Sequence, residues 1–316
     1  MQASRGSHLV AVISLALTAA IWGGGFPATK YGLQAGLSVG ALLTLRFAIG
    51  TAGLGLMVAL LRIPIRRQAV KDGLWLGLVL ATLFWLQTDG LRFTTTSKSG
   101  FITGLYVIFT PLVALLAGDR LRPSHGLGAG VALLGLLLLV REPGAAWGGW
   151  NRGDSETLLA AVLCGFHIVM TAHFSRRSSG WILAFMQVAV TGLASLFITL
   201  ALPAPWGFEG TSRALALPGT WIALAFMGIL ATTLAFYVQS TMQARLGATE
   251  SAILFSTEPL WTALLAISGW IPGIREHLGP LQLAGGLLIL AATLVAELGP
   301  RLLRRLQAAE AEDAIG

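Results

Sequence analysis

Three ionisable side chains stand inside long apolar stretches of this sequence. Glu258 lies in LFSTEPLWTALL, residues 254–265, directly before Pro259, and Arg46 and His167 lie inside other apolar runs. Burying a charge is strongly unfavourable unless a partner or a polar cavity compensates it. An acid, a cation and a histidine in such surroundings could bind a solute, carry a proton or make structural hydrogen bonds.

Three prolines inside apolar runs predict breaks in helices. Proline has no backbone N–H, so Pro27, Pro111 and Pro259 each leave the carbonyl four residues earlier without its usual donor. At membrane depth such a carbonyl is tolerated where protein, water or a ligand satisfies it. Glu258 beside Pro259 is therefore predicted to line a cavity and to meet a solute or a proton. A neutral Glu258, bonded across the bundle, is an equally open interpretation.

Polar and aromatic residues also recur on single helix faces. Thr18, Trp22 and Gly25 are spaced by four and three residues, and an indole ring can stack on a solute while its N–H donates a bond. Such faces suit a cavity for a small amphiphilic solute, but they also suit ordinary packing and interhelical hydrogen bonds. The candidate cavity residues are Thr18, Trp22, Gly25, Thr103, Tyr106, His167, Tyr237 and Glu258.

Arg46 is interpreted as a structural charge that ties its helix to carbonyls or to a neighbouring acid, in preference to a solute contact. His167 could relay a proton, donate into a cavity or pack as a neutral ring. His167 and His173 do not have metal-ligand spacing, and the single Cys164 allows no intrachain disulfide. No metal or other cofactor is expected. Without paired acids, an H-E-x-x-H motif or a nucleophile elbow, no catalytic set is expected either.

The composition indicates that lipid surrounds these residues. Of 316 residues, 55% are hydrophobic and 11% are charged, whereas soluble domains carry about 25% charged residues. Apolar runs of about 20 residues recur, and each is long enough to cross the roughly 30 Å hydrocarbon core. The net charge of +7 lies mostly between these runs, so it reports orientation and not nucleic-acid binding. The expected partners are membrane lipid and a small-molecule solute, and the chain is expected to be a monomer or a homodimer.

The apolar runs predict an all-α integral membrane protein with ten transmembrane helices. Connections are short, and the first run is interpreted as a retained helix and not as a signal peptide. Lys and Arg are nearly twice as frequent in the segments on the side of the N-terminus as on the other side, which predicts cytoplasmic termini. The predicted spans are 9–30, 38–61, 72–92, 97–117, 125–141, 155–175, 180–202, 219–241, 248–270 and 279–298.

The two halves of the chain align with each other. AAIWGGGF, residues 19–26, lines up with AAVLCGFH, residues 160–167, and the same offset pairs Arg46 with Gln187. FTPLVALL lines up with TEPLWTALL, which pairs Pro111 with Pro259. Because each half has an odd number of helices, the second half enters the membrane from the opposite side, as in inverted-topology repeats. The predicted organisation is a cytoplasmic tail 1–8, a five-helix repeat 9–141, an external linker 142–154, a second repeat 155–298 and a cytoplasmic tail 299–316.

Several motifs give the chain a family resemblance over nearly its whole length. They are WGGGFPATK in the first helix, LRF at 45–47, LQTDGLRFTTTSKSGFITGLYVIFTPLVALLAGDRL at 86–121 and GATESAILFSTEPLWTALL at 247–265. The chain resembles the EamA family of bacterial ten-helix transporters in the drug/metabolite transporter superfamily. That family commonly has a Gly-Glu pair after helices 4 and 9. Here GDRL stands at the first place, and a longer loop, SGWIPGIREHLG, stands at the second.

The resemblance implies a secondary transporter of the bacterial inner membrane with helices 1, 3, 4, 6, 8 and 9 around a midplane cavity. The expected cargo is a small metabolite or amphiphilic solute, such as an amino-acid-like compound or a drug, moved by alternating access and in the direction of export. Two alternatives remain: an intramembrane enzyme acting on a lipid or peptide, and a channel. Solute uptake into proteoliposomes separates the first alternative from a transporter, and single-channel conductance separates the second.

Overall fold

Helices are the only regular structure in the residues that the computed structural model describes, which are 5–116, 123–139, 149–203 and 205–292. Two of the helical segments are interrupted, and one contains a stretch of π-helix. The helices are α1 (Arg5–Gln34), α2 (Val39–Leu60), α3 (Arg67–Gly90), α4 (Thr96–Gly104), α5 (Tyr106–Leu116), α6 (Pro123–Leu139), α7 (Arg152–Phe174), α8 (Gly180–Ala201), α9 (Thr211–Leu215), α10 (Pro218–Ala225), the π-helix η1 (Phe226–Leu234), α11 (Ala235–Leu246), α12 (Ala248–Phe255), α13 (Glu258–Ser268) and a last helix, Pro280–Ala292.

Eight helical segments in this described part of the chain are long and apolar enough to cross a membrane. They match eight of the ten predicted spans. At the fifth and tenth predicted spans the structure has shorter apolar helices, Gly130–Leu139 and Pro280–Ala292. Residues 293–298 of the tenth span, most of the linker 142–154 and the tail 299–316 lie outside the described residues.

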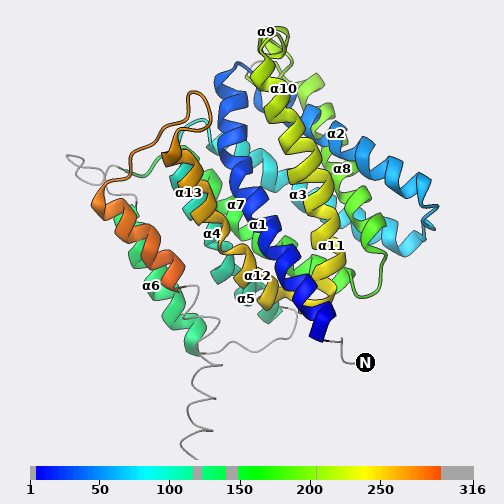
Figure 1. Cartoon of the computed structure of the whole chain (residues 1–316), viewed down its shortest axis with the longest axis horizontal. Helices are drawn as coiled ribbons and strands as arrows, with labels where there is room; N and C mark the ends of the chain where they lie inside the picture. Colours follow the sequence, from blue (N-terminus) through cyan, green and yellow to red (C-terminus); the bar gives the residue numbers. More distant parts are fainter. Residues whose placement is uncertain (1–4, 117–122, 140–148, 204, 293–316) are drawn as a thin grey trace, which may run out of the picture.

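The helices form a bundle with loops gathered at two ends (Figure 1). We call one end the Ser38 end, because the Ser38 hydroxyl donates to the carbonyl of Gly207 there (2.5 Å) and joins two loops. We call the other the Arg66 end. There Arg177 donates two hydrogen bonds to the Asp72 carboxylate, at 3.0 and 2.6 Å, and joins the loop after α7 to α3. Helix α6 and the last helix lie side by side at one edge of the bundle (Figure 1).

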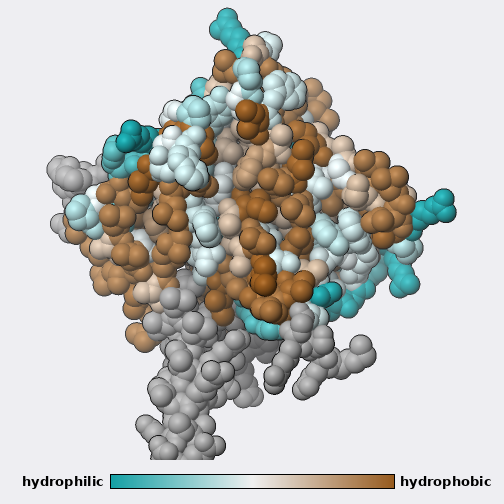
Figure 2. Space-filling view, in the orientation of Figure 1, coloured by the Kyte–Doolittle hydropathy of each residue, from teal (hydrophilic) through white to brown (hydrophobic). Residues whose placement is uncertain are grey.

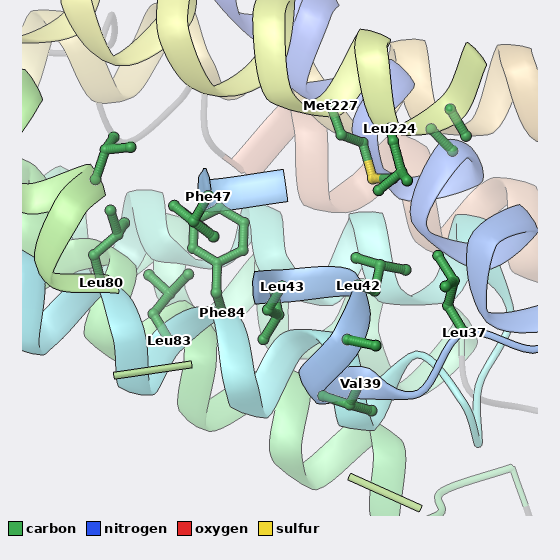
Figure 3. Packing of buried hydrophobic residues seen from close by; sticks show 14 of the residues in the cluster. Leu37, Val39, Leu42, Leu43, Phe47, Leu80, Leu83, Phe84, Leu224 and Met227 are labelled. Atoms are coloured by element: carbon green, nitrogen blue, oxygen red, sulfur yellow. The ribbon is translucent and has the colours of Figure 1, made fainter. Parts of the chain in front are cut away.

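The main core lies where α2, α3, α8 and the η1 region meet. Figure 3 shows Phe47 of α2 and Phe84 of α3 among leucines of the same helices, with Met227 of η1 facing them. The rings of Phe47 and Phe84 meet edge to face, with centroids 5.0 Å apart, a favoured arrangement for aromatic pairs. This core fixes α3, which carries one wall of the cavity described below, and α2, which contributes one residue to it.

The outer surface of the bundle is largely apolar. Leu17, Trp75, Phe197 and Ile222 are more than half exposed, and hydrophobic residues cover most of the face seen in Figure 2, with hydrophilic residues towards its margins. Exposed large side chains of this kind are unfavourable in water but suit contact with lipid tails. The surface therefore agrees with the apolar composition of the spans.

The loop between α13 and the last helix holds the start of α4. The backbone N–H of Glu276 donates to the carbonyl of Ala266 at the end of α13 (2.9 Å). Its carboxylate accepts from the backbone N–H groups of Thr96 and Ser97, at 2.5 and 2.9 Å. These donors have no partner inside the helix, and a negative charge near a helix N-terminus is favourable. The longer loop that departs from the family pattern therefore caps α4, while GDRL lies outside the described residues.

Replacing Glu276 with Ala should lower the melting temperature by about 2–4 °C, because loss of a helix cap costs about 0.5–2 kcal/mol. The measurement is thermal unfolding of purified protein in detergent. Glu209→Ala is the matched control, since Glu209 is exposed at the same end and the structure gives it no hydrogen bond or ion pair among the described residues. Equal melting temperatures for the two variants would contradict the capping role.

Candidate functional site

Two interrupted helices meet at the centre of the bundle. Leu105 separates α4 from α5, and a turn at residues 256–257 separates α12 from α13, where Pro259 occupies the first turn of the new helix. Pro111 lies inside α5, six residues beyond the interruption at Leu105, so no break is observed at Pro111 itself. A β-carbon at Gly104 would lie 2.7 Å from Cγ of Pro259. Only glycine therefore lets the two broken helices come this close.

The predicted break at Pro27 is not observed, since α1 continues through this residue from Arg5 to Gln34. The physical reason is that another donor replaces the one that proline removes. Pro27 leaves the carbonyl of Gly23 without an intrahelical donor. The hydroxyl of Thr262, on α13, donates to this carbonyl at 3.1 Å. A single substituted hydrogen bond thus lets α1 stay continuous and attaches it to α13.

A π-helical stretch supplies an acceptor for Trp22. The indole N–H of Trp22 donates to the carbonyl of Ala231 in η1 at 3.0 Å. Its ring packs against Phe236 and Phe255, with centroids 5.5 and 5.1 Å away. π-helical turns are rare and occur frequently at functional sites. Trp22 is thereby held in a fixed orientation where α1, α11 and α12 meet.

These elements enclose a cavity with a volume of about 70 Å³. Its walls come from α1, α3, α4, α5, α7, α11, α12 and α13, with one residue from α2. Pockets for drug-sized ligands have volumes of roughly 300–1,000 Å³, so a solute of that size requires a wider cavity than this one. The predicted cavity residues that line it are Trp22, Gly25, Thr103, Tyr106, His167 and Glu258. A β-carbon at Gly25 would meet no atom within 4 Å, so this glycine leaves open space in the wall.

Two of the predicted cavity residues lie elsewhere. Thr18 is buried, and its hydroxyl donates to the carbonyl of Ser14 in its own helix at 2.9 Å. Tyr237 stacks on Trp181, with ring centroids 3.9 Å apart. Its neighbour Phe236 lines the cavity, and successive residues of a helix point about 100° apart, so Tyr237 faces away.

Arg46 lines the cavity from α2 and is only 4% exposed. Its Nε donates to the hydroxyl of Thr232 at 3.0 Å. The guanidinium lies over the ring of Phe84, 4.5 Å from the centroid, in a cation–π contact. None of the described residues forms an ion pair with it. Arg46 therefore makes one structural bond, to a hydroxyl and not to the predicted carbonyl or acid. It also places a cation at the cavity wall, whose remaining N–H donors can meet an anionic group.

Glu258 lines the same cavity and is 7% exposed. The hydroxyl of Tyr106 donates to its Oε2 at 3.4 Å, which is a long hydrogen bond. No ion pair between described residues joins Glu258 to Arg46 or to another cation. An acid and a cation thus share one aromatic-walled cavity without neutralising each other directly.

Sequence reasoning missed much of the cavity wall. The additional polar residues are Gln87, Thr88 and Gln239, and the additional aromatic residues are Phe26, Phe84 and Phe255. Gln87 lies in the motif LQTDG and donates to the hydroxyl of Thr103 at 3.2 Å. The glutamines themselves were the available signal for Gln87 and for Gln239, because an amide is costly to bury without hydrogen-bond partners.

Comparison of the sequence with known protein families identifies the family of this chain. The sequence profile of the EamA-like transporter family matches residues 9–141 and 151–297. The chain belongs to this family, within the drug/metabolite transporter superfamily, and is a multi-pass membrane protein of a transporter family.

Relatives support the same assignment. An uncharacterized transporter of Archaeoglobus fulgidus is 30% identical over 293 residues, which are 92% of this chain and 87% of the relative. The aromatic amino acid exporter YddG of Ancylobacter novellus is 25% identical over 220 residues, 67% of this chain and 71% of the relative. A solved crystal structure with 21% identity has the same fold, with a TM-score of 0.64 over 95% of this chain and 99% of that chain.

Proposed function

We propose that this protein is a secondary transporter that exports an amino-acid-like zwitterion with an apolar, preferably aromatic, side chain. The observation that carries the proposal is that a buried cation, Arg46, and a buried acid, Glu258, line the same cavity. A guanidinium matches a carboxylate through two parallel hydrogen bonds, and a carboxylate can hold an ammonium group. The aromatic walls suit the side chain between them. The name of the Ancylobacter novellus relative points to the same solute class.

Glu258 also provides a means of coupling. Its carboxylate can hold an ammonium group or a proton, but protonation removes the charge that attracts the ammonium group. Proton and solute therefore compete for one site. With the cavity open to alternate sides, this competition exchanges protons for solute, so an inward proton gradient drives export.

Alternating access requires two halves that can move against each other, and the helix packing supports an inverted repeat of five helices each. Helix α3 packs on α7 and α8, while η1 and α11 pack on α2 and α1. Helices α4 and α5 pack on α7, while α12 and α13 pack on α1. Each contact has a counterpart with the halves exchanged, as a twofold relation requires. On this proposal α6 and the last helix complete the ten crossing helices.

Close glycine contacts repeat in the same way. A β-carbon at Gly77 of α3 would lie 2.6 Å from Cβ of Val190 in α8. A β-carbon at Gly228 of η1 would lie 2.6 Å from Cβ of Ile49 in α2. Ile49 and Val190 stand at the same offset as the aligned segments 19–26 and 160–167. The two crossings therefore support a common origin for the halves.

Transport of aromatic amino acids by purified protein in liposomes is the direct test. Vesicles loaded with phenylalanine or tryptophan should release it faster than protein-free vesicles, and an imposed pH gradient should raise the net flux. Lysine and glucose serve as control solutes, since one lacks an apolar side chain and the other lacks both charges. Equal release of all four solutes, or of none, would refute the proposed specificity.

We propose that the protein lies in a bacterial inner membrane with both termini in the cytoplasm. In this orientation the Ser38 end faces the outer side of the membrane. In a Cys164→Ala background, single cysteines replace the exposed Gln68, at the Arg66 end, and Ser212, at the Ser38 end. Ser212 is preferable to Gly210, whose φ of +78° strains a side chain. An impermeant thiol reagent added to intact cells should label only the cysteine at 212. Labelling only of the cysteine at 68 would show the opposite orientation, with the Arg66 end outside.

Replacing Trp22 with Ala should weaken binding of an aromatic solute by about twofold to about tenfold, because an aromatic pair contributes about 0.5–1.5 kcal/mol. The measurement is the solute concentration at half-maximal transport. Leu17→Ala is the control, because Leu17 lies in the same helix but is 59% exposed on the outer surface. An unchanged half-maximal concentration in Trp22→Ala would remove this residue from the binding site.

A further inference from the structure

A layer of buried polar side chains adjoins the cavity on the side of the Arg66 end. Its members come from α7, α8 and α11, and each is at most 3% exposed. Two of them, His167 and Gln239, also line the cavity. The members of this polar layer are His167, Thr171, Gln187, Gln239, Ser240 and Gln243.

Part of the polar layer is joined by hydrogen bonds. Nε2 of His167 and Oε1 of Gln187 are 2.7 Å apart, and Nε2 of Gln187 donates to the hydroxyl of Ser240 at 3.0 Å. Nε2 of Gln243 donates to the carbonyl of Ile168 at 2.7 Å. These bonds fix the side chains of Gln187 and Gln243 between the three helices.

Three oxygens of the polar layer remain without a hydrogen-bond partner among the described residues. They are Oγ1 of Thr171, Oε1 of Gln239 and Oε1 of Gln243. Buried polar atoms are nearly always paired, and an exception in a native fold calls for an explanation such as water. Among the described residues, four other buried hydroxyls also lack a partner, but they lie towards the Ser38 end, at Thr96, Ser97, Thr211 and Thr220. By contrast, the buried Thr191 donates to the carbonyl of Gly77, and Ser195 accepts from the indole of Trp85.

The residues that carry the unpaired oxygens form a row that leads from the cavity towards the Arg66 end. Gln239 and Gln243 are one turn apart on α11, and His167 and Thr171 are one turn apart on α7. Helices α7 and α11 pack together and run the same way, towards the Arg66 end. The row therefore leads from the cavity wall, at Gln239, to positions one turn nearer that end, at Thr171 and Gln243.

We propose that the polar layer is a hydrated path through which the cavity opens to the Arg66 end between α7 and α11. Water supplies the donors that the unpaired oxygens lack, and the same oxygens accept from the ammonium group of a solute as it passes. This inference rests on the proposed transport function, because it assigns the route by which the solute reaches the second side.

Cysteine accessibility tests the path. In the Cys164→Ala background, Thr171→Cys and Gln243→Cys are each reacted with a small charged methanethiosulfonate reagent, with purified protein in lipid nanodiscs. Charged reagents modify thiols only where water reaches them. We expect both cysteines to react at least about tenfold faster than the control Ser195→Cys, which replaces an equally buried but hydrogen-bonded residue of α8. Added solute should change the rate at 171 and 243 but not at 195.

Equal, slow modification at 171, 243 and 195 would overturn the proposal. Thr171→Cys changes the side chain little in size, so it decides the question if Gln243→Cys does not fold. The reaction needs no transport, so its outcome is separate from the liposome assay. Fast labelling without amino-acid flux would retain the path and reject the proposed solute, whereas flux without labelling would retain the transporter and reject this route.

Discussion

Arg46→Gln is expected to lower the affinity for a zwitterionic solute by about 10-fold to about 100-fold, because a hydrogen bond to a charged group contributes about 1.5–3 kcal/mol. The guanidinium is nearly fully buried, lines the cavity and has no ionic partner among the described residues. Its strongest available partner is therefore the carboxylate of the solute. The measurement is the half-maximal concentration for transport of phenylalanine, compared with that for its amide, which lacks the carboxylate.

The structural bond of Arg46 needs its own control. Thr232→Val removes the acceptor of Nε but keeps the guanidinium over Phe84. If Arg46 only fastens α2 to η1, Thr232→Val and Arg46→Gln should lower the melting temperature alike and leave solute affinity unchanged. If Arg46 binds the carboxylate, Arg46→Gln alone should lose affinity, and the loss should vanish for the amide solute. Arg46→Lys should recover only part of it, because an ammonium cannot form the bidentate pair.

Much of the helical architecture follows from the sequence, because lipid permits few alternatives. A chain that must satisfy its backbone inside a bilayer forms helices, so apolar length alone locates most of them. The start of α7 had a second signal that the prediction did not use. In NRGD the side chains of Asn151 and Asp154 each accept from the other's backbone N–H and form a capping box. This starts α7 at Arg152, three residues before the predicted boundary.

The cavity was harder to predict than the helices. Apolar runs carry little periodicity, so the direction of a side chain has to be inferred from few polar residues. Trp22 and Glu258 were assigned to the cavity on that basis, whereas Tyr237 was chosen over its neighbour Phe236, which lies there. The π-helical turn of η1, whose Ala231 carbonyl accepts from the indole of Trp22, left no signal in composition. For Arg46, the sequence does not reveal that none of the described residues forms an ion pair with it.

Glu258→Gln is expected to abolish the acceleration of solute export by a pH gradient while solute exchange continues. The amide keeps the shape of the side chain and can still accept from Tyr106, but it neither titrates nor attracts an ammonium group as a charge. The measurement compares net export under a pH gradient with exchange of labelled for unlabelled phenylalanine at equal pH. Tyr106→Phe is the matched variant, because it removes the only hydrogen bond that the described residues give the carboxyl group and keeps the carboxyl group itself.

The three roles of Glu258 give different results in these two assays. A carboxylate that carries the proton loses gradient-driven export on change to Gln, while exchange stays within about twofold of the wild type. If the carboxylate also holds the ammonium group, Glu258→Gln loses about 10-fold or more in affinity where the wild-type group is ionised, since a charge-assisted hydrogen bond contributes about 1.5–3 kcal/mol. The loss disappears at pH values where the wild-type group is protonated. A carboxyl group that serves only to bond Tyr106 across the bundle leaves both assays unchanged and lowers the melting temperature in Glu258→Gln and Tyr106→Phe alike. Unchanged solute affinity in Glu258→Gln, in the first case as in the last, would refute the competition between proton and solute on which the proposed direction of transport depends.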